Sequence, residues 1–79
     1  MREIKLCVTG GSGFIGTSVM SWALSKYKAI NFDIKPPKLL EQQHHWKYVD
    51  IRNAYSFTQA LAAFQPTHIL HLAAITGMD

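Results

Sequence analysis

The chain lacks the features that stabilise small extracellular proteins or anchor proteins in membranes. It has one cysteine, Cys7, in 79 residues, so an internal disulfide is excluded and a reduced core residue is expected. No stretch approaches the roughly 20 apolar residues needed to cross a bilayer, and the segment Met1–Lys5 opens no signal-like apolar run. We therefore expect a soluble, cytoplasmic protein with no membrane partner.

The chain also has no large excess of positive or negative charge. Eight basic and five acidic residues give a net charge of +3, and they are scattered along the chain. Because nucleic-acid binding needs clustered cations, we expect a solvated surface and no nucleic-acid partner. The adjacent His44 and His45 have no cysteine or carboxylate cluster beside them, and sequence neighbours rarely share one ion, so no metal site is expected there.

The chain does have a glycine-rich stretch between two regular elements. The largely apolar run Ile4–Val8 predicts a strand, roughly Lys5–Thr9, that is covered on both faces, and the segment after the glycines predicts a helix. The helical residues expected to pack on the sheet are Ile15, Val19, Trp22, Ala23 and Leu24. Unpaired N–H groups at a helix N-terminus carry the positive end of the helix dipole, so this order of elements predicts a phosphate cradle.

The glycine spacing fits both Gly10-x-x-Gly13-x-x-Gly16 and Gly11-x-Gly13-x-x-Gly16. An early glycine permits a tight turn, Gly13 leaves space for a phosphate, and Gly16 lets the helix lie close to the strand. Asp33 ends a second strand-like run, Ala29–Asp33, 20 residues after Gly13. This context favours a dinucleotide site over the alternative, an ordinary glycine-rich turn without a ligand.

The rest of the chain alternates strand and helix signals. The prolines at 36 and 37 take the chain out of the sheet, and a polar loop with one helical turn at Leu39–Gln43 is expected. A strand is predicted at Trp46–Val49. Asn53 is expected to cap a helix that carries three apolar residues at helical spacing and ends before Pro66. A last strand over Thr67–Leu72 completes an α/β order with parallel strands and right-handed crossovers. The three apolar residues of that helix are Phe57, Leu61 and Phe64.

Four motifs together resemble the N-terminal part of an extended short-chain dehydrogenase, in the NAD-dependent epimerase/dehydratase family. They are Thr9–Gly16, Asp33, Val49–Asn53 before a helix, and His71–Ala74 after a strand. The resemblance implies a partial Rossmann fold with a parallel sheet in the order 3-2-1-4, in which residues 1–79 form an incomplete NAD(P)-binding domain. The chain departs from the family at Thr67-His68, where members commonly have Pro-Asp, and after Ala74.

The same resemblance implies a cofactor, NAD with NADP possible, and the residues that hold it. The N–H groups of Phe14 and Ile15 would bind the pyrophosphate, and Asp33 the adenosine ribose, which favours NAD. Asp50 with Ile51 would read the adenine edge, unless Asp50 simply caps the following helix. The full implied set is Gly10, Gly13, Phe14, Ile15, Gly16, Asp33, Asp50, Ile51, Leu72, Ala73 and Ala74, of which the last three would line the path toward the nicotinamide or be small for packing alone.

No catalytic residue is expected among these 79. In the family, a Ser or Thr and a Tyr-x-x-x-Lys motif would lie beyond position 79, and the tyrosines here, Tyr27, Tyr48 and Tyr55, have no lysine four residues later. His71 is expected to be a buried, hydrogen-bonded residue rather than a catalytic one.

We therefore expect cofactor binding without turnover, with a nucleotide-sugar substrate only in a longer parent enzyme resembling epimerases and dehydratases. The alternative is a stand-alone, non-catalytic nucleotide-binding sensor or assembly module. The last strand would lie at an open edge of the sheet, so self-association through this edge or through an uncovered apolar face is also expected.

Overall fold

A computed structural model describes residues 3–73 and shows four strands and two α-helices in the predicted order. The strands form one parallel sheet in the order β3-β2-β1-β4, which confirms the predicted fold class. The elements are β1 (Lys5–Thr9), α1 (Phe14–Leu24), β2 (Lys28–Asp33), the 3₁₀ helix η1 (Leu40–His45), β3 (Trp46–Tyr48), α2 (Ala54–Phe64) and β4 (His68–His71).

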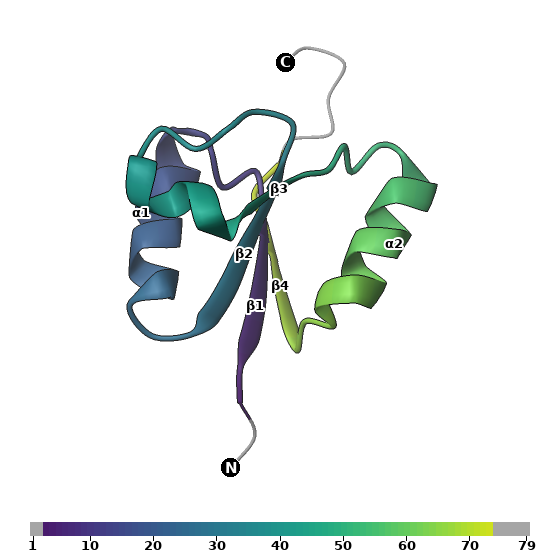
Figure 1. The fold of residues 1–79 in the computed structure, drawn as a ribbon, viewed down its shortest axis with the longest axis horizontal. Coiled ribbons are helices and arrows are strands. Elements are labelled where there is room, and N and C mark those ends of the chain that lie inside the picture. The colour runs from purple at the N-terminus through teal and green to yellow at the C-terminus, as the bar shows by residue number, and fades with distance from the viewer. Residues whose placement is uncertain (1–2, 74–79) are drawn as a thin grey trace.

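The two α-helices lie on opposite faces of the sheet (Figure 1). Because side chains alternate along a strand, β1 contributes to a core on each face. Leu6 and Val8 pack with Met20 and Ala23 of α1, whereas Cys7 packs with the α2 side. The core on that side consists of Cys7, Phe32, Val49 and Ala60, with Phe57, Leu61 and Phe64 packed against it as the helical spacing predicts.

The face that α1 turns to the sheet differs from the prediction. Ile15 is 67% exposed and Trp22 47% exposed, so the expectation that these two pack on the sheet was wrong. The buried positions are Gly16, Met20 and Ala23, spaced by four and three residues. Gly16 lets the first turn of α1 lie against the glycine turn, and in this orientation Ile15 and Trp22 are exposed.

The ends of α2 follow the sequence signals. Asn53 caps the helix, since its Oδ1 accepts a hydrogen bond from Ser56 N–H at 3.1 Å. Gln65 ends it in the left-handed conformation, with φ 54°, just before Pro66. By contrast, the cap of α1 is Gly13, which has no side chain to satisfy the first N–H groups.

The loop after β2 contains more helix than expected. Instead of one turn at Leu39–Gln43, the structure has a 3₁₀ helix that continues to His45. Gln42 anchors it to α1, because its buried side-chain Nε2 donates to Thr17 O and to Ser21 Oγ, both at 3.0 Å.

The last strand is the least covered element. All four residues of β4 are exposed, including Ile69 at 49% and Leu70 at 37%.

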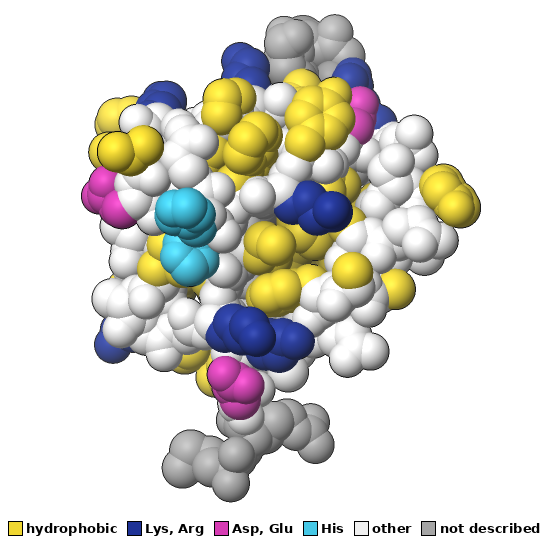
Figure 2. All heavy atoms as spheres, viewed as in Figure 1, with side chains coloured by type: hydrophobic (Ala, Val, Ile, Leu, Met, Phe, Trp, Pro, Cys, Tyr) yellow, Lys and Arg dark blue, Asp and Glu magenta, His cyan; other side chains and the backbone are white. Residues whose placement is uncertain are grey.

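On the face shown in Figure 2, Lys and Arg side chains are dispersed among hydrophobic and neutral ones. Among residues 3–73, no helix is long and apolar enough to cross a membrane.

Candidate functional site

A cleft of about 700 Å³ opens where β1, β2 and β4 end. Its volume falls in the range of roughly 300–1,000 Å³ that is typical of small-molecule sites, and carboxyl ends of parallel strands are where such folds bind ligands. Seven of the residues expected at a cofactor site line it together: Gly10, Gly13, Asp33, Asp50, Ile51, Leu72 and Ala73. Phe14, Ile15 and Gly16 form the first turn of α1 directly after Gly13. Ala74 lies outside the described residues.

The glycines of the turn are not equivalent. Gly10 has φ +77°, and a Cβ there would lie 2.8 Å from Ala73 N. A Cβ at Gly16 would collide with the backbone of Gly10 and Gly11, so this glycine brings the helix close to the turn rather than to the strand itself. Gly13 is different: a Cβ there would meet only Gly10 O, at 3.6 Å. Packing therefore does not require a glycine at position 13. The space beside Gly13, at the N-terminus of α1, is open.

Two N–H groups of this turn point into the protein, and two others lie at the N-terminus of α1. Gly11 N–H donates to Asn31 Oδ1 at 2.8 Å and Ser12 N–H donates to Asp33 Oδ2 at 3.0 Å, so both point into the protein. The first intrahelical bond of α1 runs from Thr17 N–H to Gly13 O at 2.9 Å. The N–H groups of Phe14 and Ile15 precede that bond, at the positive end of the helix dipole.

The Asp33 carboxylate is fixed by backbone donors on both oxygens. Oδ2 accepts from Ser12 N–H at 3.0 Å and Oδ1 accepts from Lys35 N–H at 3.1 Å. Each carboxylate oxygen has a further lone pair. The carboxylate at the rim of the cleft is therefore held in one orientation and can still accept hydrogen bonds from a ligand.

The second acid of the cleft, Asp50, does not cap α2, since Asn53 does. Its Oδ1 accepts from Arg52 Nε and its Oδ2 from an Arg52 guanidinium N–H, both at 3.1 Å. These side-chain hydrogen bonds hold the pKa of the Asp50 carboxyl below its ordinary value. Lys35 and Lys38 also line the cleft, so its lining contains both cations and carboxylates.

A family model described as "NAD dependent epimerase/dehydratase family" matches residues 6–79. The chain belongs to this family. The NAD-dependent character of the family agrees with the geometry, because the open space at Gly13 and the fixed Asp33 carboxylate fit a dinucleotide.

Similar proteins in the family include nucleotide-sugar enzymes. CDP-paratose 2-epimerase of Salmonella typhi is 34% identical to this chain, and the aligned region covers 95% of this chain and 25% of that protein. UDP-glucose 4-epimerase of Thermus thermophilus, solved with NAD, is 29% identical with a TM-score of 0.77, covering 90% of this chain and 24% of that one. dTDP-glucose 4,6-dehydratase of Bacillus anthracis str. Ames, also solved with NAD, is 26% identical with a TM-score of 0.78, covering 90% and 27%. The chain spans about a quarter of the length of the curated relatives it matches.

Sequence reasoning did not assign a role to two polar residues beside the cleft. Asn31 is 1% exposed and holds the glycine turn; the signal was a polar residue inside an apolar strand. Thr9 is fully buried, and its Oγ1 accepts a hydrogen bond from Ala73 N–H at 3.3 Å. Thr9 thereby ties the end of β1 to the chain that leaves β4.

His71 is hydrogen-bonded as expected, because its Nδ1 lies 2.7 Å from Thr9 Oγ1. The expectation that it is buried was wrong, since β4 lies at the uncovered edge of the sheet and His71 is exposed there. Within the described residues, no three His, Cys, Asp or Glu side chains come together as a possible metal site.

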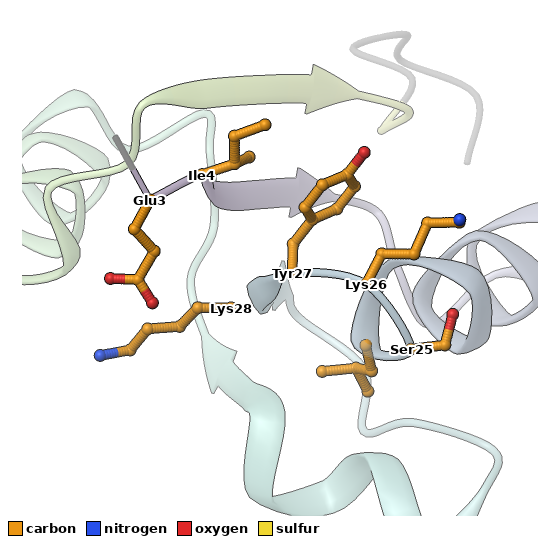
Figure 3. Close-up of a pocket in the computed structure, with 7 residues that line it drawn as sticks. Glu3, Ile4, Ser25, Lys26, Tyr27 and Lys28 are labelled. Carbon is orange, nitrogen blue, oxygen red and sulfur yellow. The ribbon is translucent and has the colours of Figure 1, made fainter. Parts of the chain in front are cut away.

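A second hollow, of about 490 Å³, lies at the amino end of β1 (Figure 3). Its polar side chains include Glu3, Lys26 and Lys28, which are exposed. It contains none of the residues that the glycine turn organises. The cleft at the carboxyl ends of the strands is therefore the candidate site.

Proposed function

We propose that this chain is the dinucleotide-binding portion of an NAD-dependent enzyme that acts on a nucleotide sugar, and that its cleft binds NAD. The observation that carries the proposal is the uncapped N-terminus of α1, which faces open space at Gly13 beside a fixed Asp33 carboxylate. The substrate class is supported by relatives that are named for CDP-, UDP- and dTDP-sugars.

In the proposed complex, the N–H groups of Phe14 and Ile15 hold the pyrophosphate and Asp33 accepts the ribose hydroxyls. Asp50 and Ile51 lie beside the adenine. Leu72 and Ala73 line the path to the nicotinamide. When bound, NAD supplies a hydride acceptor; the residues of this chain bind and orient it.

Asp33 also bears on the choice between NAD and NADP. A carboxylate that accepts two ribose hydroxyls favours NAD, whereas a 2′-phosphate at that position would meet a like charge. Lys35 opposes this preference, because it is a cationic residue that lines the same cleft. We propose that NAD binds more tightly than NADP but that NADP is not rejected outright.

We further propose that the chain by itself binds the cofactor without turning over a sugar nucleotide. Its three tyrosines, Tyr27, Tyr48 and Tyr55, are followed four residues later by Asn31, Arg52 and Gln59, so none has the lysine that would assist proton transfer. An assay with NAD and UDP- or GDP-sugars should read background. Activity that a change at His71 abolished would refute this assignment.

Calorimetric titration of the 79-residue chain with NAD and then with NADP tests cofactor binding. Saturable NAD binding, tighter than that of NADP, is expected. Leu40→Ala is a suitable control, because Leu40 is 82% exposed and is not among the residues that line the cleft; its affinity should match the unaltered chain. Failure of both nucleotides to bind at millimolar concentration would refute the proposed function.

The alternative, a stand-alone nucleotide-binding module without a reaction, predicts the same binding. Sequencing the reading frame after Asp79 separates the two: continuation into a Tyr-x-x-x-Lys helix supports the enzyme portion, and a stop codon supports the module. Because Cys7 is a free, buried thiol, which suits a reducing compartment, we propose a cytoplasmic location.

We also propose that the open edge of β4 pairs with a second copy of the chain. Among the described strands, β4 pairs with β1 alone, and it contains neither proline nor an Asp, Glu, Lys or Arg, which are the usual protections of an edge. Two copies of one strand can pair antiparallel about a twofold axis and satisfy both edges at once.

Sedimentation equilibrium at micromolar concentration tests this association and should show a dimer. Ile69→Lys places a charge on the edge and should give a monomer, whereas Leu40→Lys, a charge added away from β4, should leave the dimer intact. A monomeric unaltered chain with a cooperative thermal transition would refute the proposal.

A further inference from the structure

Asn31 lies in the middle of β2, between β1 and β3, and yet all of its side-chain hydrogen bonds are with the glycine turn. It is 1% exposed, Oδ1 accepts from Gly11 N–H at 2.8 Å, and Nδ2 donates to Ser12 Oγ at 2.9 Å. A buried amide in a strand is costly unless it is paired. Here the pairing partners come from a turn 19 and 20 residues earlier in the chain, so Asn31 connects β2 to that turn.

The hydrogen bonds continue through Ser12 to the loop that follows β2. Ser12 Oγ donates to Lys35 O at 2.7 Å, and Ser12 N–H donates to Asp33 Oδ2 at 3.0 Å. Ser12 is therefore bonded on one side to the strand and on the other to the segment that carries the rim carboxylate. A displacement of the glycine turn would move Asp33 as well.

The donor and acceptor groups of the partners determine the direction of each of these hydrogen bonds. Gly11 N–H can only donate, so the amide oxygen of Asn31 must face it and the NH₂ group must face Ser12. The Ser12 hydroxyl, which receives that hydrogen bond, has its own proton left for Lys35 O. Aspartate at position 31 would present an acceptor to Ser12 and compete for the proton that Lys35 O now receives.

Packing reinforces the hydrogen bonds at this point. A Cβ at Gly11 would lie 2.6 Å from both Cγ and Oδ1 of Asn31. Asn31 therefore occupies the space beside Gly11, and the turn approaches β2 closely only because position 11 has no side chain. Gly11 and Asn31 form a matched pair.

We propose that Asn31 is a positioning residue: it holds the glycine turn against β2 and, through Ser12, fixes the Asp33 loop, so that the phosphate and ribose halves of the site are coupled. The inference rests on the proposed function for its ligand. Asn31 itself is buried and touches no ligand; it acts through Gly11 and Ser12. Loss of either link should loosen the phosphate turn and the ribose carboxylate together.

Amide hydrogen exchange in the ligand-free chain tests the link without any cofactor. In Asn31→Leu, exchange at the Gly11 amide should become at least tenfold faster, because its acceptor is gone. In Asn31→Asp, an oxygen still faces Gly11 and its protection should be retained. Leu61→Ala is the matched control, since it weakens the α2-side core without touching the turn. Unchanged exchange at Gly11 in Asn31→Leu would refute the proposal.

Ser12→Ala keeps Asn31 and removes only the hydroxyl of Ser12. It is the second variant for the exchange experiment, and it can be used if Asn31→Leu does not fold. Exchange at the Lys35 and Ser12 amides, both of which donate to Asp33, should accelerate at least threefold in this variant relative to Leu61→Ala. If both amides keep their protection, the coupling through Ser12 is refuted even if Gly11 depends on Asn31.

Affinity measurements then separate coupling from a general loss of stability. ADP, which has both a ribose and a diphosphate, should bind at least tenfold more weakly to Ser12→Ala, and adenosine, which reaches the Asp33 carboxylate but not the phosphate turn, should also bind at least threefold more weakly. Leu61→Ala, measured well below its melting temperature, should change both by less than twofold. A loss for ADP with unchanged affinity for adenosine would overturn the coupling. Absence of ADP binding in the unaltered chain would refute the proposed function, while the exchange experiment still decides the role of Asn31.

Discussion

Gly13 is the position at which stability and cofactor binding are expected to change in opposite directions. Its backbone, at φ −76° and ψ −177°, is extended and open to any residue, and a Cβ would meet only Gly10 O at 3.6 Å. Gly13→Ser supplies a side-chain oxygen at the cap of α1. That oxygen can accept from the N–H of Ile15 or Gly16, as Asn53 does for α2.

The expected gain in stability has two sources. A serine cap is better than glycine by a few tenths of a kcal/mol, and replacing glycine restricts the unfolded chain by about 0.4–1 kcal/mol. The free energy of unfolding should therefore rise by about 0.5–1.5 kcal/mol, which for a domain of this size raises the melting temperature by roughly 2–12 °C.

The expected loss in binding comes from the same oxygen. The N–H group that the introduced hydroxyl would accept from is one that the pyrophosphate uses in the proposed complex, and the side chain fills the space beside it. Losing one hydrogen bond to a charged group costs about 1.5–3 kcal/mol, so NAD should bind roughly tenfold to a hundredfold more weakly.

Thermal melts without ligand and calorimetric titration with NAD measure the two effects separately. Gly13→Ala is the control: it adds the Cβ without a capping oxygen, and since alanine is a poor cap it should weaken binding without raising the melting temperature. A Gly13→Ser chain that bound NAD as well as the unaltered chain would show that the phosphate does not lie at this helix end. A lower melting temperature would refute the assignment of Gly13 as a replaceable cap.

Three further outcomes are expected. Asp33→Asn should weaken NAD binding by about 1.5–3 kcal/mol in calorimetry, because an amide offers only one oxygen where the carboxylate offers two; undiminished affinity would contradict this. Gly10→Ala should lower the free energy of unfolding by more than about 1 kcal/mol in urea denaturation, since φ is +77° and its Cβ would lie 2.8 Å from Ala73 N, whereas Gly13→Ala should be tolerated. Burial raises the pKa of Cys7 to about 12, so the folded chain should resist iodoacetamide at pH 8 by mass spectrometry. The buried neutral thiol favours folding, and this contribution is lost as pH rises from about 9 toward 12; rapid labelling of the folded chain would count against it.

Local signals were sufficient to predict the first strand and the start of one helix. The apolar run Lys5–Thr9 became β1 with the same bounds, and Asn53 became the cap of α2, because each depends on a few adjacent residues. The strand order 3-2-1-4 followed from the resemblance and is confirmed.

Contacts between distant segments were harder to predict. Ile15 and Trp22 have helical spacing and are apolar, and only the close approach of Gly16 to Gly10 and Gly11 shows that α1 is rotated away from them. Asn31 was missed because its role depends on a distant turn that presents an N–H and a hydroxyl at the right places. Sequence alone shows a polar residue in a strand but not its partner.

The central position of β1 has a consequence for the order of folding. Cys7 pairs with Ile30 of β2, 23 positions away, and with Ile69 of β4, 62 positions away. Closing the longer loop costs about 0.9 kcal/mol more in chain entropy, and α1 packs on Leu6 and Val8 of β1 and Ala29 of β2. The unit β1-α1-β2 can therefore form while the chain is still being synthesised, and it contains the whole glycine turn with Asn31 and Asp33. A nascent chain would therefore contain the whole turn proposed to bind phosphate before β4 emerges and pairs with β1.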